Sequence, residues 1–447
     1  MIKKKSTIII LIIVLTTLFY YVLSPIKTTA EENKAQTTEQ WEDSDFMDPT
    51  RFEETAFHRL VDSTIFNSKL YVASGVSIDN GESAQNKIFV QAYNGESWEN
   101  IGTPIISKAD QLQLDKISFC KKGENELYLF YISEGLLEVS KLNTNNNTWS
   151  EVTSLSDVSN DFDITSDNDE IYMTILNQNG DISKLFKFDG TNLNEIATLR
   201  QNAGYLGKTK VTILKDSIYI AIKEPGKINI SLYQYKPSEN EIKEIEDCEV
   251  NLFNSEYEMV TVLENTREKL YITSTQTENV LVHTYDGTNF AKLEESGLPQ
   301  NLYILSISSR DGELYITGLL DGKLQTYTHN RNNNTFLKEG LDIENISPEV
   351  AQAIEFNNNI YTLYIPPDEE EIKIKRKSYI KITLKGDIDG DNRVTTKDAI
   401  LGAKGLAKIT TLSEKQIAAG DINGDKRLST SDLILISKFL AKIINSL

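Results

Sequence analysis

A short motif recurs seven times in the middle of the chain, and it limits the possible folds more than any other feature. An aliphatic residue precedes a tyrosine, alternating apolar residues follow, and most copies come after a polar, turn-prone stretch. This pattern is typical of a buried strand entered from a tight turn. The seven tyrosines, which recur at similar intervals, are Tyr71, Tyr128, Tyr172, Tyr219, Tyr271, Tyr315 and Tyr361.

A second motif follows the tyrosine in the first six units. It predicts a strand, a turn and an apolar or aromatic residue that opens the next strand. Asn-Gly and Asp-Gly supply the positive φ angles that a tight hairpin requires. The closest copies are 93–98, 188–193 and 285–290, and the looser ones are 145–149, 235–242 and 332–336. Each unit therefore contains about four short strands.

Seven such units predict a mainly β chain with a seven-bladed β-propeller at residues 50–384. A single blade cannot bury both of its faces, whereas a ring of blades covers them and leaves few exposed edges. We expect Phe52 to Leu60 to complete the sheet of the last blade and so close the ring. Six or eight blades, or a tandem of β-sandwiches, are the structural alternatives.

The repeat units resemble kelch-like and sialidase-like propellers in their Tyr-x-Gly-x-x-Trp character, best seen at Tyr93 to Trp98. The kelch double glycine is absent, and this segment lacks the Ser and Asp of the sialidase Asp-box. No arginine triad is visible, which argues against sialidase activity. We expect the tyrosines and tryptophans to pack between blades. Propellers usually bind ligands at the central channel or on one loop face.

Residues 1–30 have the pattern of a signal peptide. Lys3, Lys4 and Lys5 precede an apolar run from Ile8 to Leu23, and small residues end at Ala30, where cleavage is expected. An uncleaved membrane anchor is the alternative, because the run approaches spanning length. Residues 31–49 are polar and without periodicity, so we expect a flexible leader. The protein is therefore predicted to be secreted and extracellular.

Composition excludes several functions. A formal net charge of −20 argues against nucleic-acid binding, which needs a basic surface. Cys120 and Cys248 are more consistent with buried free thiols than with a bridge. His58, His283 and His329 are widely spaced and form no zinc motif.

The hydrophobic pattern changes after Leu384, where two segments, 386–398 and 420–432, match position by position. Each carries oxygen-bearing side chains at positions 1, 3, 5 and 12 of a loop. Ca²⁺ is a hard cation that requires six to eight oxygen ligands, and Mg²⁺ fits this pattern less well. We expect two calcium ions; Asp-rich turns without metal are the alternative.

The predicted side-chain ligands are Asp387, Asp389, Asp391 and Asp398 in the first loop and Asp421, Asn423, Asp425 and Asp432 in the second. Position 7 would donate a backbone carbonyl from Arg393 and Arg427, and position 9 supplies Thr395 and Ser429.

A helix is predicted after each loop. Val394 and Leu428, at position 8 of the loops, should point into a shared core. No helix is expected before the first loop, because Ser378 to Leu384 has the pattern of a strand. The residues that share one helical face are Ala399, Gly402, Leu406 and Ile409 in the first helix and Leu433, Ile436, Leu440 and Ile443 in the second.

Residues 385–447, with both loops and both helices, resemble a type I dockerin, the module that anchors secreted enzymes to cohesins in bacterial cellulosomes. The resemblance implies a small all-α module whose partner is a cohesin domain of a scaffold protein. It also implies partner contacts by Thr396, Lys397, Ala403, Lys404, Lys408, Thr430, Ser431, Ser437, Lys438 and Lys442. Position 6 departs from the usual glycine, being Asn392 and Lys426, so the second loop is expected to be the weaker site. Because Thr396-Lys397 differs from Thr430-Ser431, equivalence of the two faces does not follow.

Three functions are compatible with these features. The favoured one is a non-catalytic component whose propeller binds carbohydrate or protein while the dockerin binds a cohesin scaffold. The second is a propeller enzyme, a glycoside hydrolase or polysaccharide lyase, and the third is a cell-surface adhesin. No catalytic residues can be chosen among so many Asp and Glu side chains.

Overall fold

The structure is a computed structural model with two compact units, one within residues 38–379 and one that begins at residue 380. The predicted signal peptide lies outside the described residues. The described residues are 41–46, 56–79, 84–108, 114–167, 169–200, 208–224, 227, 229–245, 248, 250, 257–264, 267–275, 280–293, 296–310, 313–330, 335–343, 351–357, 359–366, 372–378, 385–389, 393–412, 414–423 and 427–444.

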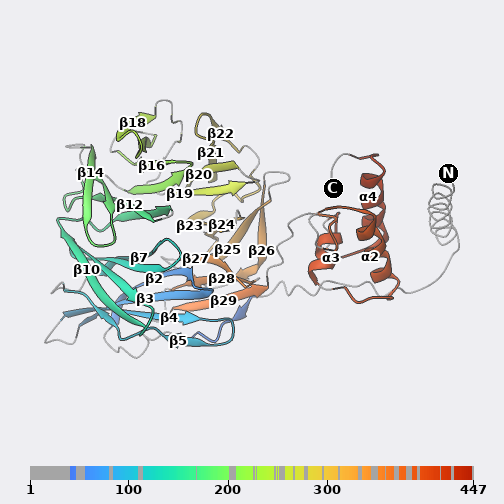
Figure 1. Ribbon diagram of the computed structural model, residues 1–447, viewed down its shortest axis with the longest axis horizontal. Coiled ribbons are helices and arrows are strands. Elements are labelled where there is room, and N and C mark those ends of the chain that lie inside the picture. Colours follow the sequence, from blue (N-terminus) through green and yellow to red (C-terminus); the bar gives the residue numbers. More distant parts are fainter. Residues whose placement is uncertain are drawn as a thin grey trace. The chain divides into compact units, whose positions relative to one another are not determined.

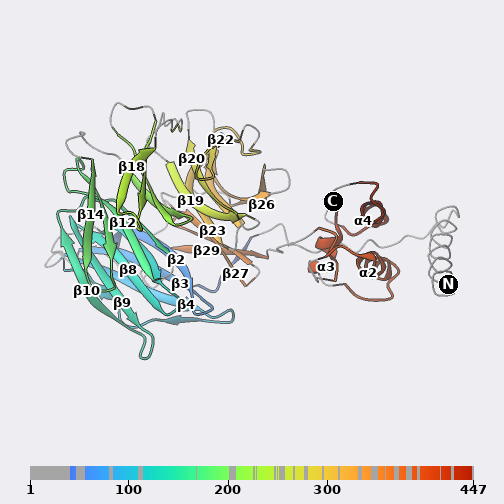
Figure 2. The ribbon, with the colours of Figure 1, turned by 45° about the horizontal axis from the view of Figure 1, so that its top comes forward.

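Seven antiparallel sheets form the first unit, one for each repeat (Figures 1 and 2). The seven-bladed propeller is therefore confirmed. Blade 1 contains β2 (Ala56–Phe66), β3 (Lys69–Asp79), β4 (Ala84–Tyr93) and β5 (Trp98–Asn100), with β6 (Ile105–Ile106) paired to β4. Blade 2 contains β7 (Leu114–Lys122), β8 (Glu126–Ser133), β9 (Leu136–Asn143) and β10 (Thr148–Ser156). Blade 3 contains β11 (Phe162–Asp167), β12 (Glu170–Leu176), β13 (Ser183–Phe188) and β14 (Leu193–Arg200). Blade 4 contains β15 (Thr209–Leu214), β16 (Ser217–Ile222), β17 (Ser231–Lys236) and β18 (Glu241–Ile245).

Blades 5 to 7 repeat this arrangement. Blade 5 contains β19 (Tyr257–Glu264), β20 (Arg267–Thr275), β21 (Val280–Tyr285) and β22 (Phe290–Lys292). Blade 6 contains β23 (Tyr303–Arg310), β24 (Glu313–Leu320), β25 (Lys323–Asn330) and β26 (Thr335–Ile343). Blade 7 contains β27 (Ala351–Phe356), β28 (Asn359–Tyr364), β29 (Lys373–Ser378) and β1 (Glu42–Asp43).

The ring closes through β1, which pairs antiparallel with β29 as the outermost strand of blade 7. The expectation that Phe52 to Leu60 closes the ring is wrong for its described part, since 56–60 belong to β2 of blade 1. The closing strand comes instead from the segment expected to be a flexible leader. Blade 7 thus joins the two ends of the propeller sequence.

The two repeated motifs meet across the boundaries between blades. Every motif tyrosine lies on the second strand of its blade and is at least 96% buried. Five of them contact an aromatic ring at or next to the end of the third strand of the next blade, with interplanar angles of 61° to 85°, an arrangement that aromatic pairs favour. The pairs are Tyr128–Phe188, Tyr172–Tyr235, Tyr219–Tyr285, Tyr271–His329 and Tyr361–Tyr93. The repeat therefore encodes the packing of neighbouring blades.

The Asn-Gly and Asp-Gly turns adopt one geometry. Gly95, Gly190 and Gly287 have φ of 103°, 102° and 96°, which side chains other than glycine rarely adopt. The preceding Asp189 and Asp286 carboxylates accept backbone N–H groups two and three residues later at 2.7–2.8 Å. These local bonds fix the hairpins between the third and fourth strands.

The first strand of each blade lies innermost, and a polar contact crosses each of the seven boundaries between neighbouring first strands. These contacts are 2.6–2.8 Å long except the last, at 3.4 Å. In ring order they are Asp62–Phe119, Lys116–Asp161, Asp163–Val211, Lys210–Glu258, Ser309–Thr261, Ser308–Ala353 and Gln352–Ser63. Charged groups occupy the boundaries from blade 1 to blade 5, and uncharged groups occupy the rest.

The environment of these charged groups changes their ionisation. Burial raises the pKa of Asp62 to about 6. Burial also opposes the charged form of Lys210, but the nearby carboxylates of Glu258 and Asp163 outweigh it and raise the pKa of this lysine. The pKa of Glu258 is lowered, because Lys210 and Lys208 outweigh its burial. The innermost strands thus contain acidic and basic side chains whose charges neutralise one another.

The second unit contains α2 (Thr396–Leu406), α3 (Glu414–Gly420) and α4 (Thr430–Leu440). Helices α2 and α4 are the two predicted helices and contact each other. Helix α3 was not predicted and precedes the second loop. The core includes Ile388, Leu412, Ile417, Leu428 and Ile436, with Val394 packed against it, so the two position-8 side chains share one core as expected.

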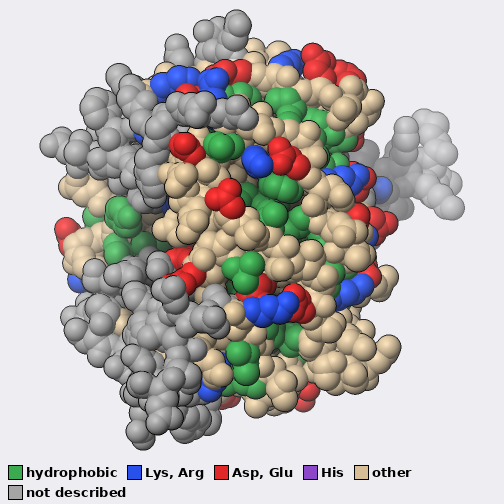
Figure 3. All heavy atoms as spheres, turned by 90° about the vertical axis from the view of Figure 1, so that its left-hand side faces the viewer, with side chains coloured by type: hydrophobic (Ala, Val, Ile, Leu, Met, Phe, Trp, Pro, Cys, Tyr) green, Lys and Arg blue, Asp and Glu red, His purple; other side chains and the backbone are tan. Residues whose placement is uncertain are grey.

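Two further expectations concern the chain as a whole. Cys120 and Cys248 are buried free thiols, as predicted. The described residues include no helix of the length and apolar character needed to span a bilayer. On the face shown in Figure 3, acidic and basic side chains are interspersed among uncharged ones despite the net charge of −20.

Candidate functional site

The first predicted calcium loop brings three of its carboxylates together. One ligand oxygen from each of Asp387, Asp389 and Asp398 lies within 4.8 Å of the other two, and we call this group the first-loop cluster. Asp387 and Asp398 are buried, at 6% and 0% exposure. Three ionised carboxylates at this separation repel one another strongly unless a cation lies between them. The donor set fits Ca²⁺, a hard cation that carboxylate oxygens bind.

The second loop also buries the aspartates at its positions 1 and 12. Asp421 and Asp432 are buried, at 8% and 0% exposure, and Asn423 occupies position 3. The position-5 residues of both loops, Asp391 and Asp425, lie outside the described residues. With an amide at position 3 in place of a carboxylate, the second loop offers less negative charge to a cation.

The position-12 aspartate closes each loop. Asp398 accepts the backbone N–H of Asp389 at 2.9 Å and of Thr395 at 2.7 Å. Asp432 accepts the equivalent N–H groups of Asn423 at 3.1 Å and Ser429 at 2.9 Å. A carboxylate has about four lone-pair sites, and Asp398 accepts three hydrogen bonds from described residues, which leaves one site for a cation. Asp432 also accepts the Ile422 N–H at 2.9 Å, so four hydrogen bonds share its lone-pair sites.

The same aspartates start the helices. Thr395 and Ser429 are the N-cap residues of α2 and α4, with nearly identical backbone angles (φ −133° and −132°), and each forms a capping box with the aspartate three residues later. Their hydroxyls donate to Asp398 at 3.1 Å and to Asp432 at 2.6 Å. Loop closure and helix initiation therefore depend on the same side chain. The position-7 carbonyls of Arg393 and Arg427 remain predicted ligands.

Small residues let the two halves approach closely. A Cβ atom on Gly402 would lie 2.6 Å from Leu433 of α4, and one on Gly420 would lie 2.7 Å from Leu428. The start of the first loop is also bound to the second half: Gly386 N–H donates to the Ala419 carbonyl at 2.7 Å, and Lys385 Nζ donates to the Asp421 carbonyl at 3.0 Å. The duplicated halves thus fold as one body.

Comparison with protein families explains this architecture. The dockerin type I domain model matches residues 385–441. These residues form a dockerin type I domain. Dockerin type I domains typically bind calcium, and a dockerin domain implies a cohesin partner in a cellulosome-type assembly. No curated protein matches the chain.

The solved structures that are similar to this chain have low sequence identity to it. The β-propeller domain of the trilobed protease from Pyrococcus furiosus is 9% identical (TM-score 0.47; 72% of this chain and 94% of that chain). A putative 6-phosphogluconolactonase from Bacteroides fragilis is 13% identical (TM-score 0.47; 70% and 92%). An oligogalacturonate lyase in complex with manganese is 9% identical (TM-score 0.46; 72% and 97%). None of these similarities bears on function, and the kelch-like or sialidase-like subtype stays a prediction.

All ten partner-contact residues predicted in the dockerin domain are exposed. The structure adds two residues that sequence reasoning missed, Ile400 and Ile434, which are 52% and 49% exposed. They lie at matching positions of the two loop–helix repeats. Ile400 follows Thr396 by four residues and precedes Lys404 by four, so the three share one helical face. The sequence signal that could have identified them is an isoleucine outside the apolar face that each helix turns toward the core.

The apolar face predicted for each helix includes one residue that lies beyond the C-terminal end of the helix. Ile409 and Ile443 are 73% and 70% exposed, because α2 ends at Leu406 and α4 at Leu440. Lys408 and Lys442 follow the helices with φ of 55° and 58°, the left-handed conformation that often terminates a helix. Two of the predicted partner contacts therefore also have a role in ending the helices.

Proposed function

We propose that this chain is a secreted component of a cellulosome-type complex. Its dockerin domain binds two calcium ions and a cohesin, and its propeller binds carbohydrate or protein. The observation that carries the proposal is the duplicated loop–helix unit, in which each loop buries the aspartates at positions 1 and 12 and the first loop brings three carboxylates together. In this proposal the extracellular protein is held at a cell surface only through a cohesin-bearing scaffold.

The proposed calcium ligands are those of the two loops. Asp387, Asp389, Asp398, Asp421, Asn423 and Asp432 supply side-chain oxygens at the positions described above. Asp391 and Asp425 complete the set from outside the described residues. Arg393 and Arg427 donate carbonyls, and Thr395 and Ser429 act through their hydroxyl oxygens or a water. One ion in each loop would neutralise the buried carboxylates and fix the start of the following helix.

The proposed cohesin-binding surface has one copy on each helix. An exposed isoleucine lies at its centre, Ile400 on α2 and Ile434 on α4, with hydroxyl and lysine side chains around it. An apolar centre with a polar rim is the usual anatomy of a protein interface. The surrounding residues are Thr396, Lys397, Ala403, Lys404 and Lys408 in the first copy and Thr430, Ser431, Ser437, Lys438 and Lys442 in the second.

The backbone geometry of the two copies is nearly the same, whereas their side chains differ. Lys397 in the first copy corresponds to Ser431 in the second, and Ala403 corresponds to Ser437. The extra cation gives the first copy an electrostatic contribution that the second lacks. We therefore expect a cohesin to bind both copies with unequal affinity.

Binding of the full chain to a cohesin in calcium tests this surface. The variants are Ile400→Glu, Ile434→Glu and the double variant, and the matched control is Ile106→Glu, which changes a 53% exposed isoleucine in the propeller. We expect the double variant to weaken binding at least about tenfold, since central apolar contacts dominate interface energetics. The control should bind like the wild type. Wild-type affinity in the double variant, with helical content intact, would refute the assignment.

A further inference from the structure

The seventh repeat unit differs from the other six at the start of its outermost strand. In blades 1 to 6, an aromatic or aliphatic residue near the start of the fourth strand pairs with a residue at or next to the end of the third. These residues are Trp98, Trp149, Leu193, Ile242, Phe290 and Phe336. In blade 7 the outermost strand is β1, which comes from the other end of the propeller sequence.

Trp41 takes the equivalent position in blade 7. The third-strand residue at this position is Lys377, which pairs with Ile360, the residue before the motif tyrosine. The register of β1 with β29, continued by one residue, places Trp41 opposite Lys377. Blades 1, 3, 4 and 5 have an aromatic ring where blade 7 has this lysine. The N-terminal segment therefore supplies an aromatic side chain that the seventh unit lacks.

The segment around Trp41 contacts three blades. Trp41 is half-buried and packs against a cluster that contains Tyr315 of blade 6 and Ile360 of blade 7. Phe46 lies 5.0 Å from Trp98 of blade 1, ring to ring, at an interplanar angle of 71°. We call residues 41–46 the latch. It lies across both boundaries of blade 7.

Few contacts hold the latch besides its two aromatic side chains. β1 has two register pairs with β29, whereas β10 has eight with β9. Ser44 N–H also donates to the Ile374 carbonyl at 2.9 Å. Glu42 and Asp43 form ion pairs with β29, but their side chains are 55% and 81% exposed, and exposed ion pairs contribute little. Trp41 and Phe46 therefore anchor the latch.

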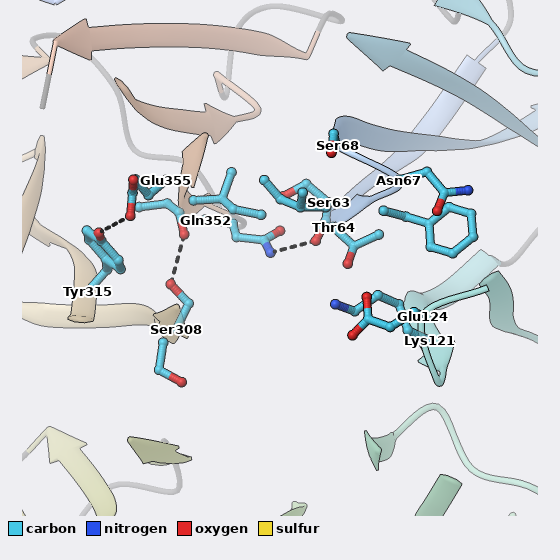
Figure 4. Close-up of a pocket in the computed structure, with 15 residues that line it drawn as sticks. Ser63, Thr64, Asn67, Ser68, Lys121, Glu124, Ser308, Tyr315, Gln352 and Glu355 are labelled. Atoms are coloured by element: carbon cyan, nitrogen blue, oxygen red, sulfur yellow. Dashed lines mark hydrogen bonds between the residues drawn. The ribbon is translucent and has the colours of Figure 1, made fainter. Parts of the chain in front are cut away.

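The latch also contacts the wall of a cavity. This cavity, of about 600 Å³, is lined by residues of the innermost strands β2, β23 and β27, by the turn between β7 and β8, and by Tyr315 of β24 (Figure 4). Tyr315 and Ala353 line it and belong to the cluster against which Trp41 packs. The Tyr315 hydroxyl donates to Glu355, another lining residue, at 3.4 Å (Figure 4). Trp41 thus supports residues that form one side of the cavity.

We propose that the latch is released as a unit while the seven blades stay folded, and that its closure fixes the cavity wall at Tyr315 and Ala353. Segments held by few buried contacts open locally, at a lower free energy than the whole domain. Release uncovers the outer edge of β29, and an uncovered strand edge can pair with another strand. The closed and released states therefore differ in the rigidity of the cavity wall and in the exposure of blade 7.

Hydrogen exchange of the full chain in calcium, followed by mass spectrometry, tests the proposal. In the wild type, the latch should exchange at least about tenfold faster than β10, because it opens without unfolding of a blade. Trp41→Ala should remove the remaining protection of the latch and speed exchange in β24 and β27, while blades 3 and 4 keep wild-type rates. Trp149→Ala, at the equivalent position of blade 2, is the matched control and should leave the latch unchanged.

A charge variant decides the question if Trp41→Ala does not fold. Glu42→Lys/Asp43→Lys changes only exposed side chains and places two cations opposite basic residues of β29. It should speed exchange of the latch by about 3- to 10-fold, since like charges on paired strands repel. The control Glu239→Lys/Glu241→Lys changes the net charge equally on exposed residues of blade 4 and should not affect the latch.

Three results would overturn the proposal. The first is a wild-type latch that exchanges as slowly as β10. The second is faster exchange in all seven blades of Trp41→Ala, which would make ring closure inseparable from folding of the propeller. The third is a released latch with wild-type exchange rates in β24 and β27, which would show that the latch does not fix the cavity wall.

Discussion

Carboxylates are arranged differently in the propeller and in the dockerin domain. In the propeller, Asp161 lies 2.7 Å from Lys116, and Glu258 lies 2.6 Å from Lys210. In the first-loop cluster of the dockerin domain, the carboxylates approach one another instead. The propeller therefore contains its own countercharges, whereas we propose that the first-loop cluster binds a cation from solution. This proposal predicts that the propeller folds without metal and that folding of the dockerin domain depends on it.

The largest expected effect is the loss of the dockerin domain when calcium is removed. A ligand bound only by the folded state at about 1,000 times its Kd contributes about 4 kcal/mol, which is most of the stability of a domain this small. Thermal unfolding followed by circular dichroism should show two transitions in calcium. In EDTA, or in the Asp387→Ala/Asp421→Ala variant, the helical transition should disappear and the β-propeller transition should remain. A helical transition that is unchanged in EDTA would contradict the comparison.

The next effect concerns the buried ion pair of the propeller. Glu258→Gln leaves Lys210 charged without its closest partner and should lower the free energy of unfolding by about 3 kcal/mol. Replacing both residues by apolar ones, in Lys210→Met/Glu258→Leu, should recover most of this loss. The control is Glu195→Gln in the exposed pair with Lys184, which should cost less than about 1 kcal/mol. Urea unfolding in EDTA measures the stability of the propeller alone. Equal losses of unfolding free energy in Glu258→Gln and Glu195→Gln would show that burial does not strengthen the Lys210–Glu258 pair.

A smaller effect depends on pH. Burial raises the pKa of Asp62 from 3.8 to about 6, so the folded propeller holds this proton more tightly than the unfolded chain. Stability attributable to Asp62 is therefore greatest at low pH and falls as the pH rises from about 4 to about 6. Asp62→Asn keeps an acceptor for the Phe119 N–H but does not titrate. Its stability relative to the wild type should rise by about 1–2 kcal/mol between pH 4 and pH 7, and a pH-independent difference would refute the shift.

The smallest effect separates two roles of the terminal lysines in the dockerin domain. Lys408→Gly and Lys442→Gly should each stabilise it by about 0.5–1 kcal/mol, because glycine adopts positive φ without strain. The same variants should weaken cohesin binding if the lysines contact the partner. Thermal melting in calcium measures the first effect, and binding measures the second. Lower melting temperatures in both variants would show that the lysine side chains stabilise the helix ends.

Sequence periodicity predicted the parts of the molecule in which each repeat of the sequence forms the same strands or helices and packs in the same way. The seven tyrosines predicted the blade number, because each occupies the same place on a second strand. The grouping of Asp387, Asp389 and Asp398 was predictable, because a calcium loop takes ligands from positions 1, 3 and 12. Ring closure by Glu42–Asp43 could not be predicted, because a strand of two residues is too short to show a hydrophobic periodicity. The cavity that Ser63, Ser308 and Gln352 line was not predictable either, because these residues come from strands far apart in the sequence.

The most direct measurement of the central claim is the affinity of the full chain for a cohesin in calcium and in EDTA. We predict specific binding in millimolar calcium, its loss by at least about a hundredfold in EDTA, and full recovery when calcium is restored, because the docking helices form only around the bound ions. The propeller should remain folded throughout as an internal control. Equal affinity in calcium and EDTA, or no cohesin binding in calcium by a chain with folded helices, would contradict this account.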